Sequence, residues 1–504
     1  MAVPVWSVDP RTGKQREQVA VEATAAEVDA AVRAAARAIP ALADRSVRSR
    51  LLRAAAGALE ESAAAVIAAA DAETALGVPR LTGELARTAY QLRAFAEVVD
   101  EGAFLDVIID HADPAAQPIP RPDLRRMKIP LGVVAVYAAS NFPLAFSVPG
   151  GDTASALAAG CPVVVKAHPD HPATSALCTE LLRAAAVSVG LPADTVVTLH
   201  GFQAGVELVR HPLVAAAGFT GSVPGGRALY DAAAARPQPI PFYGELGSLN
   251  PVVVTPDAAA ERAEQIGAGL AGSFTLGVGQ FCTKPGLVLA PAGQDGDRLV
   301  AALTAAAGEA APGVLLDARM RDNFLKGAAS RVALPGVSAP VVPAGEGETG
   351  VRPGFVTVAA PDLDESLLEE CFGPLTVVVR YGSAAELAAV LDRLPGNLTA
   401  TAHLGSAEAA QEGGSAAALL ARLTALAGRV LVDGWPTGVA VAPAQHHGGP
   451  YPATTSTSTS VGATAIERWL RPVAYQDTPP ALLPLELRDA NPLGVPRRVD
   501  GTLS

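Results

Sequence analysis

Short apolar runs alternate with helical stretches along much of the chain. Residues 132–137 (GVVAVY) and 162–167 (PVVVKA) are rich in β-branched residues, lack polar alternation and are bounded by turn residues. Such runs are typical of strands that are buried on both faces of a parallel sheet. Further elements are then predicted as a helix at 151–159, a helix at 172–189, a strand at 195–200, a helix at 204–210 and a strand at 215–220. This order predicts a doubly wound α/β layer.

A second series of the same kind begins at the apolar run 251–255. It continues with apolar strands at 286–290 and 375–379, an alanine-rich helix at 383–393 and a strand at 429–434. We therefore predict an α/β fold with two doubly wound α/β domains. No internal repeat of fixed period is visible, and the tract TTSTSTS at 454–460 is short enough to be a loop.

Two other regions have a different pattern. From residue 24 to about residue 105, apolar residues recur at three- and four-residue spacing, which predicts helices. Thr24 and Glu27 have the spacing of a capping box, so a helix should begin there. Residues 114–130 carry five prolines, and because proline breaks helices we expect an extended excursion or an edge hairpin.

Length and charge limit the possible classes of protein. A chain of 504 residues is too long for one hydrophobic core, so two or three domains are expected. The net charge is −12 and no cluster of Lys and Arg is present, which argues against a nucleic-acid partner. The long uncharged stretches at 131–151 and 265–283 are interrupted by proline, asparagine or several glycines, so we predict no membrane span.

The four cysteines are far apart, at Cys161, Cys178, Cys282 and Cys371. They form no CxxC pair and no Cys/His spacing that is typical of zinc, so we predict no metal site. Few, scattered thiols in a large chain favour reduced cysteines and a cytoplasmic location. The first residues become polar within ten positions, so no secretory signal is expected.

Cys282 lies in the segment GVGQFCTKPG at 277–286. Most free cysteines are small buried hydrophobic residues, and this interpretation suits Cys161 and Cys178. The glycines around Cys282 remove packing partners and let the backbone approach a bound molecule, which gives a thiol the access that a nucleophile needs. We expect such a thiol to react quickly with iodoacetamide near neutral pH. No histidine is near Cys282 in sequence, so spacing indicates no Cys/His pair.

Glu245 and Asn141 are the candidate partners of this thiol. Glu245 lies in FYGELGSLNP; an isolated Glu is usually a surface charge, but together with a nucleophile it becomes a candidate general base. Asn141 follows the strand at 132–137, and parallel strands place ligands at their carboxyl ends. Its side chain either caps a turn or donates an N–H group to an oxyanion.

The segment GFTGSVPGG at 218–226 is a candidate phosphate site. It differs from G-x-G-x-x-G, so the glycine pattern alone is weak. Gly221, Ser222 and Gly225 lie where a strand is followed by a helix, and backbone N–H groups at such a helix start can bind phosphate.

Taken together, these segments resemble the aldehyde dehydrogenase superfamily over essentially the whole chain. The matching words, in order, are SNFPLAFS, PVVVKAHP, GFTGS, GELGSLNP, GQFCTKPG and EECFGPLTVVV. Longer words, including PIPFYGELGSLNP and HGGPYPATTSTSTSVGATAIERWLRPVAYQD, resemble the branch of α-ketoglutaric semialdehyde (2,5-dioxopentanoate) dehydrogenases and NADP-dependent fatty aldehyde dehydrogenases. The resemblance implies three parts: a Rossmann-like cofactor-binding domain (1–116, 132–245 and 446–471), a catalytic domain (246–445) and a small β bridging or oligomerisation element (117–131 and 472–504).

The resemblance also implies roles for single residues. Cys282 would attack the aldehyde, Asn141 and the backbone N–H of Cys282 would stabilise the oxyanion, and Glu245 would activate water to release the acid. For the cofactor it implies Lys166 at the adenosine ribose, Ser222 at the pyrophosphate, Glu370 at the nicotinamide ribose and Phe372 beside the ring. Without the resemblance, Lys166 and Glu370 would be ordinary surface charges.

Departures from the family pattern bear on the cofactor and the substrate pocket. Many NAD-using relatives have a glutamate three residues after the lysine, where this chain has Pro169, so NADP is acceptable and is our preferred cofactor over NAD. Sequence leaves open whether His168, His171 or Arg210 touches its 2′-phosphate. The usual Trp before the oxyanion Asn is Ser140, and HHGGPYPATTSTSTS replaces the usual glycine-rich C-terminal segment.

The expected activity is NAD(P)-dependent oxidation of a small aldehyde to its acid, with 2,5-dioxopentanoate giving 2-oxoglutarate. A carboxylate-bearing substrate calls for a cation near the pocket mouth, and Lys284 is a weak candidate that otherwise faces solvent. One alternative keeps the chemistry with a medium- or long-chain aldehyde, and another is a non-catalytic binding or structural relative. A CoA-acylating variant is disfavoured because Glu245 is present. We also expect a homodimer or homotetramer.

Overall fold

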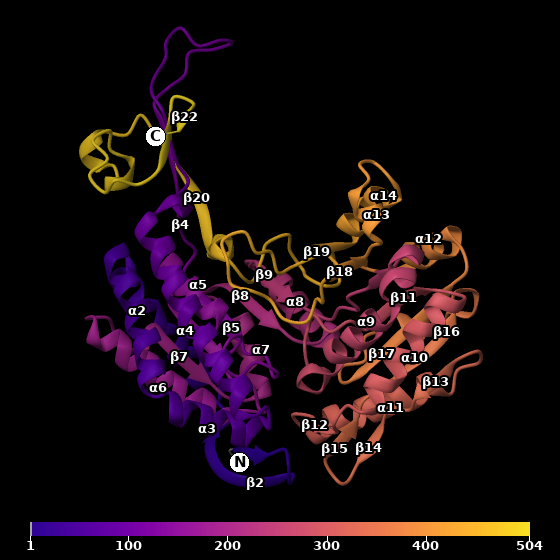
Figure 1. The fold of residues 1–504 in the computed structure, drawn as a ribbon. Coiled ribbons are helices and arrows are strands. Elements are labelled where there is room, and N and C mark those ends of the chain that lie inside the picture. Colours follow the sequence, from indigo (N-terminus) through magenta and orange to yellow (C-terminus); the bar gives the residue numbers. More distant parts are fainter. Residues whose placement is uncertain (1–2, 504) are drawn as a thin grey trace.

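The computed structural model describes residues 3–503 and consists of three parts (Figure 1). A five-stranded parallel sheet and a seven-stranded sheet lie in two adjacent lobes, and a separate five-stranded sheet projects from the first lobe. A β1–β2 hairpin (Pro4–Asp9 and Lys14–Val21) and a three-stranded sheet of β12 (Gly313–Val314), β15 (Gly350–Arg352) and β14 (Ala344–Glu346) complete the strands. The predicted α/β fold class is confirmed.

The first lobe contains the parallel sheet ordered β7-β6-β5-β8-β9. Its strands are β5 (Val133–Tyr137), β6 (Val163–Lys166), β7 (Val196–Leu199), β8 (Val214–Thr220) and β9 (Phe242–Glu245). Alternate residues of β5 pack into two different hydrophobic cores. Val134 and Val136 belong to one core, and Val133 and Ala135 belong to the other. Burial on both faces is why these strands read as continuous apolar runs. The connecting helices are α5 (Gly151–Ala159), α6 (Pro172–Ser188), α7 (Phe202–Arg210) and α8 (Val223–Ala234).

The predicted helical region before this sheet forms four helices. They are α1 (Ala25–Ala38), α2 (Arg45–Glu61), α3 (Ala63–Thr74) and α4 (Val78–Glu101). The capping box at the start of α1 is confirmed, because the Thr24 side chain accepts from the Glu27 N–H and Glu27 accepts from the Thr24 N–H. Helix α4 packs against α2 and α5, and this places one of its faces near the segment that follows β5.

The second lobe contains the sheet ordered β13-β16-β17-β11-β10-β18-β19. Its strands are β10 (Val252–Val254), β11 (Leu287–Pro291), β13 (Ser338–Val341), β16 (Gly354–Ala359), β17 (Leu375–Tyr381), β18 (Asn397–His403) and β19 (Ala427–Val432). All pairs are parallel except β13 with β16, which is antiparallel at one edge. The helices are α9 (Pro256–Thr275), α10 (Gln294–Gly308), α11 (Ala318–Val332), α12 (Ala384–Arg393), α13 (Ser406–Ala410) and α14 (Ser415–Leu426).

The third sheet forms the projecting arm, with the order β20-β4-β3-β21-β22 (Figure 1). Its strands are β3 (Val107–Asp110), β4 (Leu124–Pro130), β20 (Leu470–Gln476), β21 (Arg497–Val499) and β22 (Thr502–Leu503). The proline-rich segment is extended as predicted, and a bridge between Asp113 and Arg121 closes it. The exact boundaries of the three predicted domains stay a prediction. Among residues 3–503, no helix is both long enough and apolar enough to cross a membrane.

Candidate active site

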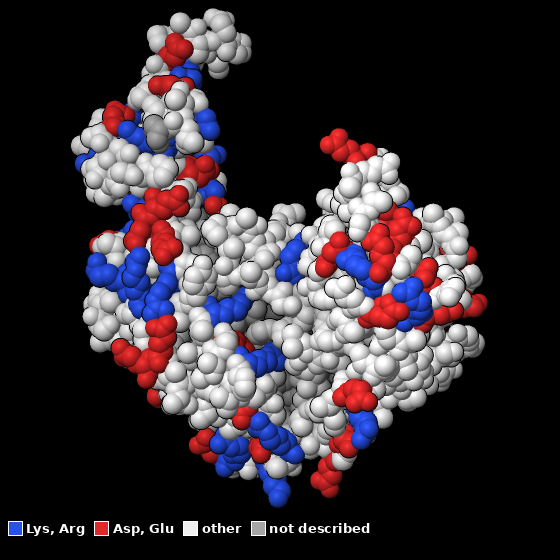
Figure 2. Space-filling view, in the orientation of Figure 1, with Lys and Arg blue, Asp and Glu red and all other residues white. Residues whose placement is uncertain are grey.

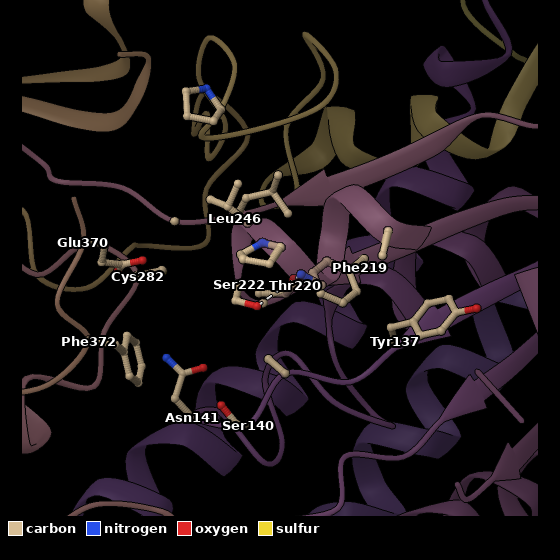
Figure 3. Close-up of a pocket in the computed structure, with 18 of the residues that line it drawn as sticks. Tyr137, Ser140, Asn141, Phe219, Thr220, Ser222, Leu246, Cys282, Glu370 and Phe372 are labelled. Carbon is tan, nitrogen blue, oxygen red and sulfur yellow. Dashed lines mark hydrogen bonds between the residues drawn. The ribbon is translucent and has the colours of Figure 1, made fainter. Parts of the chain in front are cut away.

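A cavity of about 1420 Å³ lies between the two lobes, at the carboxyl ends of the strands in the first sheet. Nine of the ten predicted site residues line it: Asn141, Lys166, His168, Gly221, Ser222, Gly225, Cys282, Glu370 and Phe372. Figure 3 shows Cys282 and Glu370 on one side, and Thr220 and Ser222 on the opposite wall. The tenth residue, Glu245, is 3% exposed and lies beside Cys282.

The loop that carries Cys282 has a constrained backbone. Gly277, Val278 and Gly279 all have positive φ angles (57°, 59° and 65°), a region that a β-branched residue such as Val278 rarely adopts. A Cβ atom on Gly279 would lie 2.3 Å from the carbonyl of Gly373, so only glycine permits this close approach. The loop is therefore held in place, contrary to the flexible setting suggested by its glycines.

The side chains of Asn250 and Lys284 fix this loop through hydrogen bonds to backbone carbonyls. Asn250 donates its amide N–H groups to the carbonyls of Cys282 (2.8 Å) and Lys284 (2.9 Å). Lys284 is 2% exposed, and its Nζ donates to the carbonyls of Cys371 (2.7 Å) and Leu375 (2.8 Å). The interpretation of Lys284 as a cation at the pocket mouth, or as a solvent-facing residue, is therefore wrong: it anchors the loop in the interior.

Cys282, Glu245 and His447 form a compact cluster. Their ligand atoms all lie within 4.8 Å of one another. His447 Nε2 is 2.8 Å from Glu245 Oε1 and 3.5 Å from Cys282 Sγ, and its side chain is fully buried. On its other side, Glu245 Oε2 accepts from the Ser460 hydroxyl at 2.7 Å. The sequence spacing did not reveal this histidine, which follows Cys282 by 165 positions.

The segment with the TTSTSTS tract brings His447 and Ser460 to Glu245. Thr454 forms an isolated bridge with Glu245, and the Thr455 hydroxyl accepts from the Gly244 N–H at 2.8 Å. The Thr459 hydroxyl accepts from the His447 N–H at 2.8 Å. The tract is a loop, as predicted, but its hydroxyl groups act as a hydrogen-bonding frame around the carboxylate.

The cluster changes the acidity of both catalytic candidates. Burial raises the pKa of the Cys282 thiol well above its usual range, and the nearby negative charge of Glu245 raises it further. Burial alone would raise the pKa of Glu245, but His447 and the hydrogen bonds from His447 and Ser460 outweigh it and lower the pKa. The resting cluster is therefore a thiol beside a carboxylate.

This protonation state reverses one expectation from the sequence. We now expect iodoacetamide to label Cys282 slowly near neutral pH, because the thiolate is the reactive form. The rate should stay low around neutral pH and rise only in alkaline solution, since the raised pKa keeps the thiol protonated until then. Mass-spectrometric labelling rates from pH 6 to 10 check this, with buried Cys178 as the internal reference. Rapid labelling at pH 7 that does not increase with pH would contradict it.

Asn141 lies beside the loop that carries Cys282 and is fixed from two directions. Its Nδ2 donates one N–H to the carbonyl of Gln280 at 2.9 Å, and its own carbonyl accepts from Arg80 at 2.7 Å. An amide nitrogen carries two hydrogens, so the second N–H of Asn141 is available to a bound molecule. This geometry is compatible with an oxyanion donor.

The far wall of the cavity suits a dinucleotide. Ser222 caps the N-terminus of α8, and its hydroxyl accepts from the Gly225 N–H, so the helix start faces the cavity. Lys166 ends β6 in the wall and, within the described part of the chain, forms no ion pair or side-chain hydrogen bond. An unpaired ammonium group and a helix N-terminus both favour a ligand that carries hydroxyls and phosphates. The residues present therefore fit NAD(P).

The three candidates for contact with a 2′-phosphate lie in different places. His168 and Arg210 line the cavity, whereas His171 is fully buried and its Nε2 lies 2.9 Å from the carbonyl of Ala139. Glu370 faces the cavity. Desolvation of its carboxylate there raises its pKa to about 7, while the positive charge of Lys284 acts in the opposite direction. Figure 2 shows the hollow between the lobes on this face, with Lys and Arg side chains at its edge.

The profile described as "Aldehyde dehydrogenase family" matches residues 4–412. The chain belongs to the aldehyde dehydrogenase family. This aldehyde dehydrogenase is 50% identical over 445 residues to alpha-ketoglutaric semialdehyde dehydrogenase 2 of Azospirillum brasilense, covering 87% of this chain and 84% of that protein. It is 44% identical over 444 residues to alpha-ketoglutaric semialdehyde dehydrogenase of Acinetobacter baylyi, covering 86% and 82%.

Solved structures agree on the fold. The gamma-glutamyl-gamma-aminobutyraldehyde dehydrogenase of Burkholderia cenocepacia superposes with a TM-score of 0.79 at 23% identity, covering 94% of this chain and 92% of that one. A putative aldehyde dehydrogenase from Burkholderia cenocepacia gives a TM-score of 0.78 at 24% identity, covering 95% of this chain and 96% of that one. The family resemblance found in the sequence is confirmed.

Proposed function

We propose that this aldehyde dehydrogenase oxidises 2,5-dioxopentanoate to 2-oxoglutarate with NADP or NAD as the electron acceptor. The observation that carries the chemistry is the cluster of the Cys282 thiol, the Glu245 carboxylate and the His447 imidazole, in which Cys282 lines the large cavity. The substrate follows from the names of the two relatives that are 50% and 44% identical to this chain.

The first half-reaction begins with the thiol proton. Glu245 is ionised and next to the thiol, so its carboxylate takes the proton as Cys282 Sγ attacks the aldehyde carbon. His447 lies against both partners and holds the carboxylate beside the sulfur. The thiohemiacetal oxyanion accepts the second N–H of Asn141 and the backbone N–H of Cys282. Bound NAD(P)⁺ supplies the hydride acceptor.

The second half-reaction releases the acid. Once the Cys282 thioester has formed, Glu245 must return its proton to solvent before it can accept one from water. His447 and Ser460 keep the carboxylate aimed at the sulfur throughout. Water attack then breaks the C–S bond, and the proton returns to the thiol.

NADP is the preferred cofactor of the proposal. Pro169 occupies the position where many NAD-using relatives carry a glutamate, so no carboxylate there repels a 2′-phosphate. Cationic Lys166 and Arg210 line the same wall of the cavity as His168. The proposal places Lys166 and His168 at the adenosine ribose and its phosphate, Ser222 with Gly221 and Gly225 at the pyrophosphate, and Glu370 with Phe372 at the nicotinamide riboside.

Steady-state rates on 2,5-dioxopentanoate and decanal, each with NADP and NAD, test the proposal. We expect the highest kcat/KM for the dioxo acid with NADP. If decanal is oxidised as well as the dioxo acid, the alternative of a fatty aldehyde dehydrogenase is correct. If no aldehyde is oxidised, the alternative of a non-catalytic relative is correct.

We also propose that the projecting arm joins subunits into a homodimer or homotetramer. Its sheet ends in the edge strand β20, and apolar side chains on the arm are strongly exposed: Ile119 (72%), Leu482 (73%) and Leu503 (70%). An edge strand and exposed apolar groups on one projection favour contact with another chain.

A paired substitution tests this role of the arm. The double variant Ile119→Asp with Leu482→Asp should shift the enzyme toward a smaller assembly, because charges on a buried contact oppose association. Light scattering after size-exclusion chromatography measures the mass. Val187→Asp is the matched control, because Val187 is an exposed residue of helix α6 (58% exposed) that lies outside the arm, and it should keep the native mass. An unchanged mass in the double variant would contradict the arm as the contact.

A further inference from the structure

One face of α4 carries polar residues into the protein beside the catalytic cluster. Arg80, Glu84, Arg87 and Gln91 are spaced by four, three and four residues, so they share one face of the helix. This face contacts the segment after β5: Arg80 donates to the Asn141 carbonyl, and Glu84 Oε1 accepts from the N–H groups of Leu144 and Ala145 (2.8 and 2.9 Å).

The two arginines of this face differ in their contacts. Arg80 donates through Nη2 to the Asn141 carbonyl and lies 5.0 Å and 4.7 Å from the ring centres of Phe142 and Phe281, while its Nε and Nη1 have no acceptor among the described residues. Arg87 lies 5.2 Å from the ring centre of Phe146, but both of its terminal nitrogens are buried and bind no acceptor among the described residues. Buried guanidinium nitrogens without acceptors are costly in a folded protein, so they indicate a ligand.

Arg87 lies near the catalytic cluster, with the ring of Phe146 beside it. Its neighbour Phe146 lies 6.1 Å, ring centre to ring centre, from His447, which itself touches the thiol. Phe142 packs edge-on against both Phe146 (5.4 Å) and Phe281 (5.3 Å). The rings of Phe146, Phe142 and Phe281 therefore form a continuous apolar row from the Arg87 guanidinium to the Cys282 loop.

Electrostatics agree with this placement. Burial lowers the pKa of Arg87, while Glu84, and then Cys282 and Glu245 when ionised, act to raise it. The charge of Arg87 is thus felt at the reacting groups, although no carboxylate lies within ion-pair distance of it among residues 3–503. Neither Arg87 nor Arg80 lines the large cavity, so the Arg87 guanidinium is not part of the wall that carries Lys166 and Ser222.

We propose that Arg87 binds the carboxylate at the far end of the substrate, with Phe142 and Phe146 along its carbon chain and the aldehyde at Cys282. A guanidinium group matches a carboxylate with two parallel N–H···O bonds, which its unpaired terminal nitrogens are free to make. This inference rests on the proposed function and names the residue that selects a short aldehyde acid over an uncharged aldehyde.

Replacing Arg87 tests the inference. In Arg87→Leu, kcat/KM for 2,5-dioxopentanoate should fall about 100-fold, the loss of one charge-assisted bidentate contact. The rate on pentanal, which has the same five carbons and no carboxylate, should fall much less, because it loses only the charge that is felt at Cys282 and Glu245. Arg87→Lys should lie between, because it keeps the charge and loses the fork. Arg93→Leu, on the exposed side of the same helix, is the control and should keep the wild-type preference.

Thermal unfolding separates recognition from a structural role. Because the terminal nitrogens of Arg87 have no hydrogen-bond acceptor among residues 3–503, and a leucine can keep the apolar contact with Phe146, Arg87→Leu should keep the wild-type Tm. A lowered Tm with equal losses on both substrates would overturn the inference. If the wild type prefers the dioxo acid and Arg87→Leu keeps that preference, the inference fails while the proposed function stands. If the wild type shows no preference for the dioxo acid, both fail.

Discussion

Cys282→Ser should lose aldehyde oxidation almost completely. A serine hydroxyl has the same shape but is a far weaker nucleophile than sulfur, and Glu245 is not basic enough to ionise it. We expect kcat to fall at least about 1000-fold, as for other enzymes that lose their nucleophile. Stopped-flow formation of reduced cofactor at saturating aldehyde measures both the first turnover and the steady state, and both should be lost.

Cys371→Ser is a close control for this variant. Cys371 also lines the large cavity, but it is 9% exposed and forms no part of the Glu245 and His447 cluster. Cys371→Ser should therefore keep near wild-type kcat. Cofactor binding, followed by the rise in Tm on adding NADP, should be the same in both variants. Full activity in Cys282→Ser, or loss of activity in Cys371→Ser, would contradict the assignment of Cys282 as the nucleophile.

Glu245→Gln should divide the reaction into its two halves. The amide cannot take a proton from water, so the thioester should accumulate, and steady-state turnover should fall about 1000-fold. The change also removes the negative charge that raises the pKa of Cys282, so the thiolate can still form, and a burst of reduced cofactor of up to one equivalent per Cys282 should persist. Rapid-quench measurement of the burst, with mass spectrometry of the acylated Cys282, checks both parts.

Ser460→Ala is the graded comparison for Glu245→Gln. It removes one hydrogen bond to the carboxylate but leaves the base in place, so we expect a loss of about 10-fold without accumulation of acyl-enzyme. Should Glu245→Gln turn over at the wild-type rate, the carboxylate is not the base. Should it lose burst and steady state equally, its main role precedes hydride transfer.

Several of the predicted strands are apolar runs that are buried on both faces. β5 and β6 were found for this reason, and so were β10, β11 and β17. β18 was not found, although all of NLTATAH is buried. Its buried threonines, Thr399 and Thr401, alternate with apolar residues, and a strand of this kind looks half-exposed in sequence.

The candidate site was predicted where each residue lies in a recognisable local word. Cys282, Asn141 and Glu245 are of this kind, and the structure brings them together; their roles stay predictions. His447 has no such word, because its place depends on hydrogen bonds from Thr459 and on a chain path that returns to β9. Arg87 is likewise invisible in sequence, since the helical pattern gives its face but not what that face meets.

The order in which the arm's strands are made has a consequence for biogenesis. β3 and β4 emerge from the ribosome early, but their sheet neighbours β21 and β20 come from residues 470–499, near the other end of the chain. During translation the edges of β3 and β4 therefore wait for residues not yet synthesised. We expect the two lobes to fold first, and the arm to complete its sheet and join subunits only once residues 470–499 have been made.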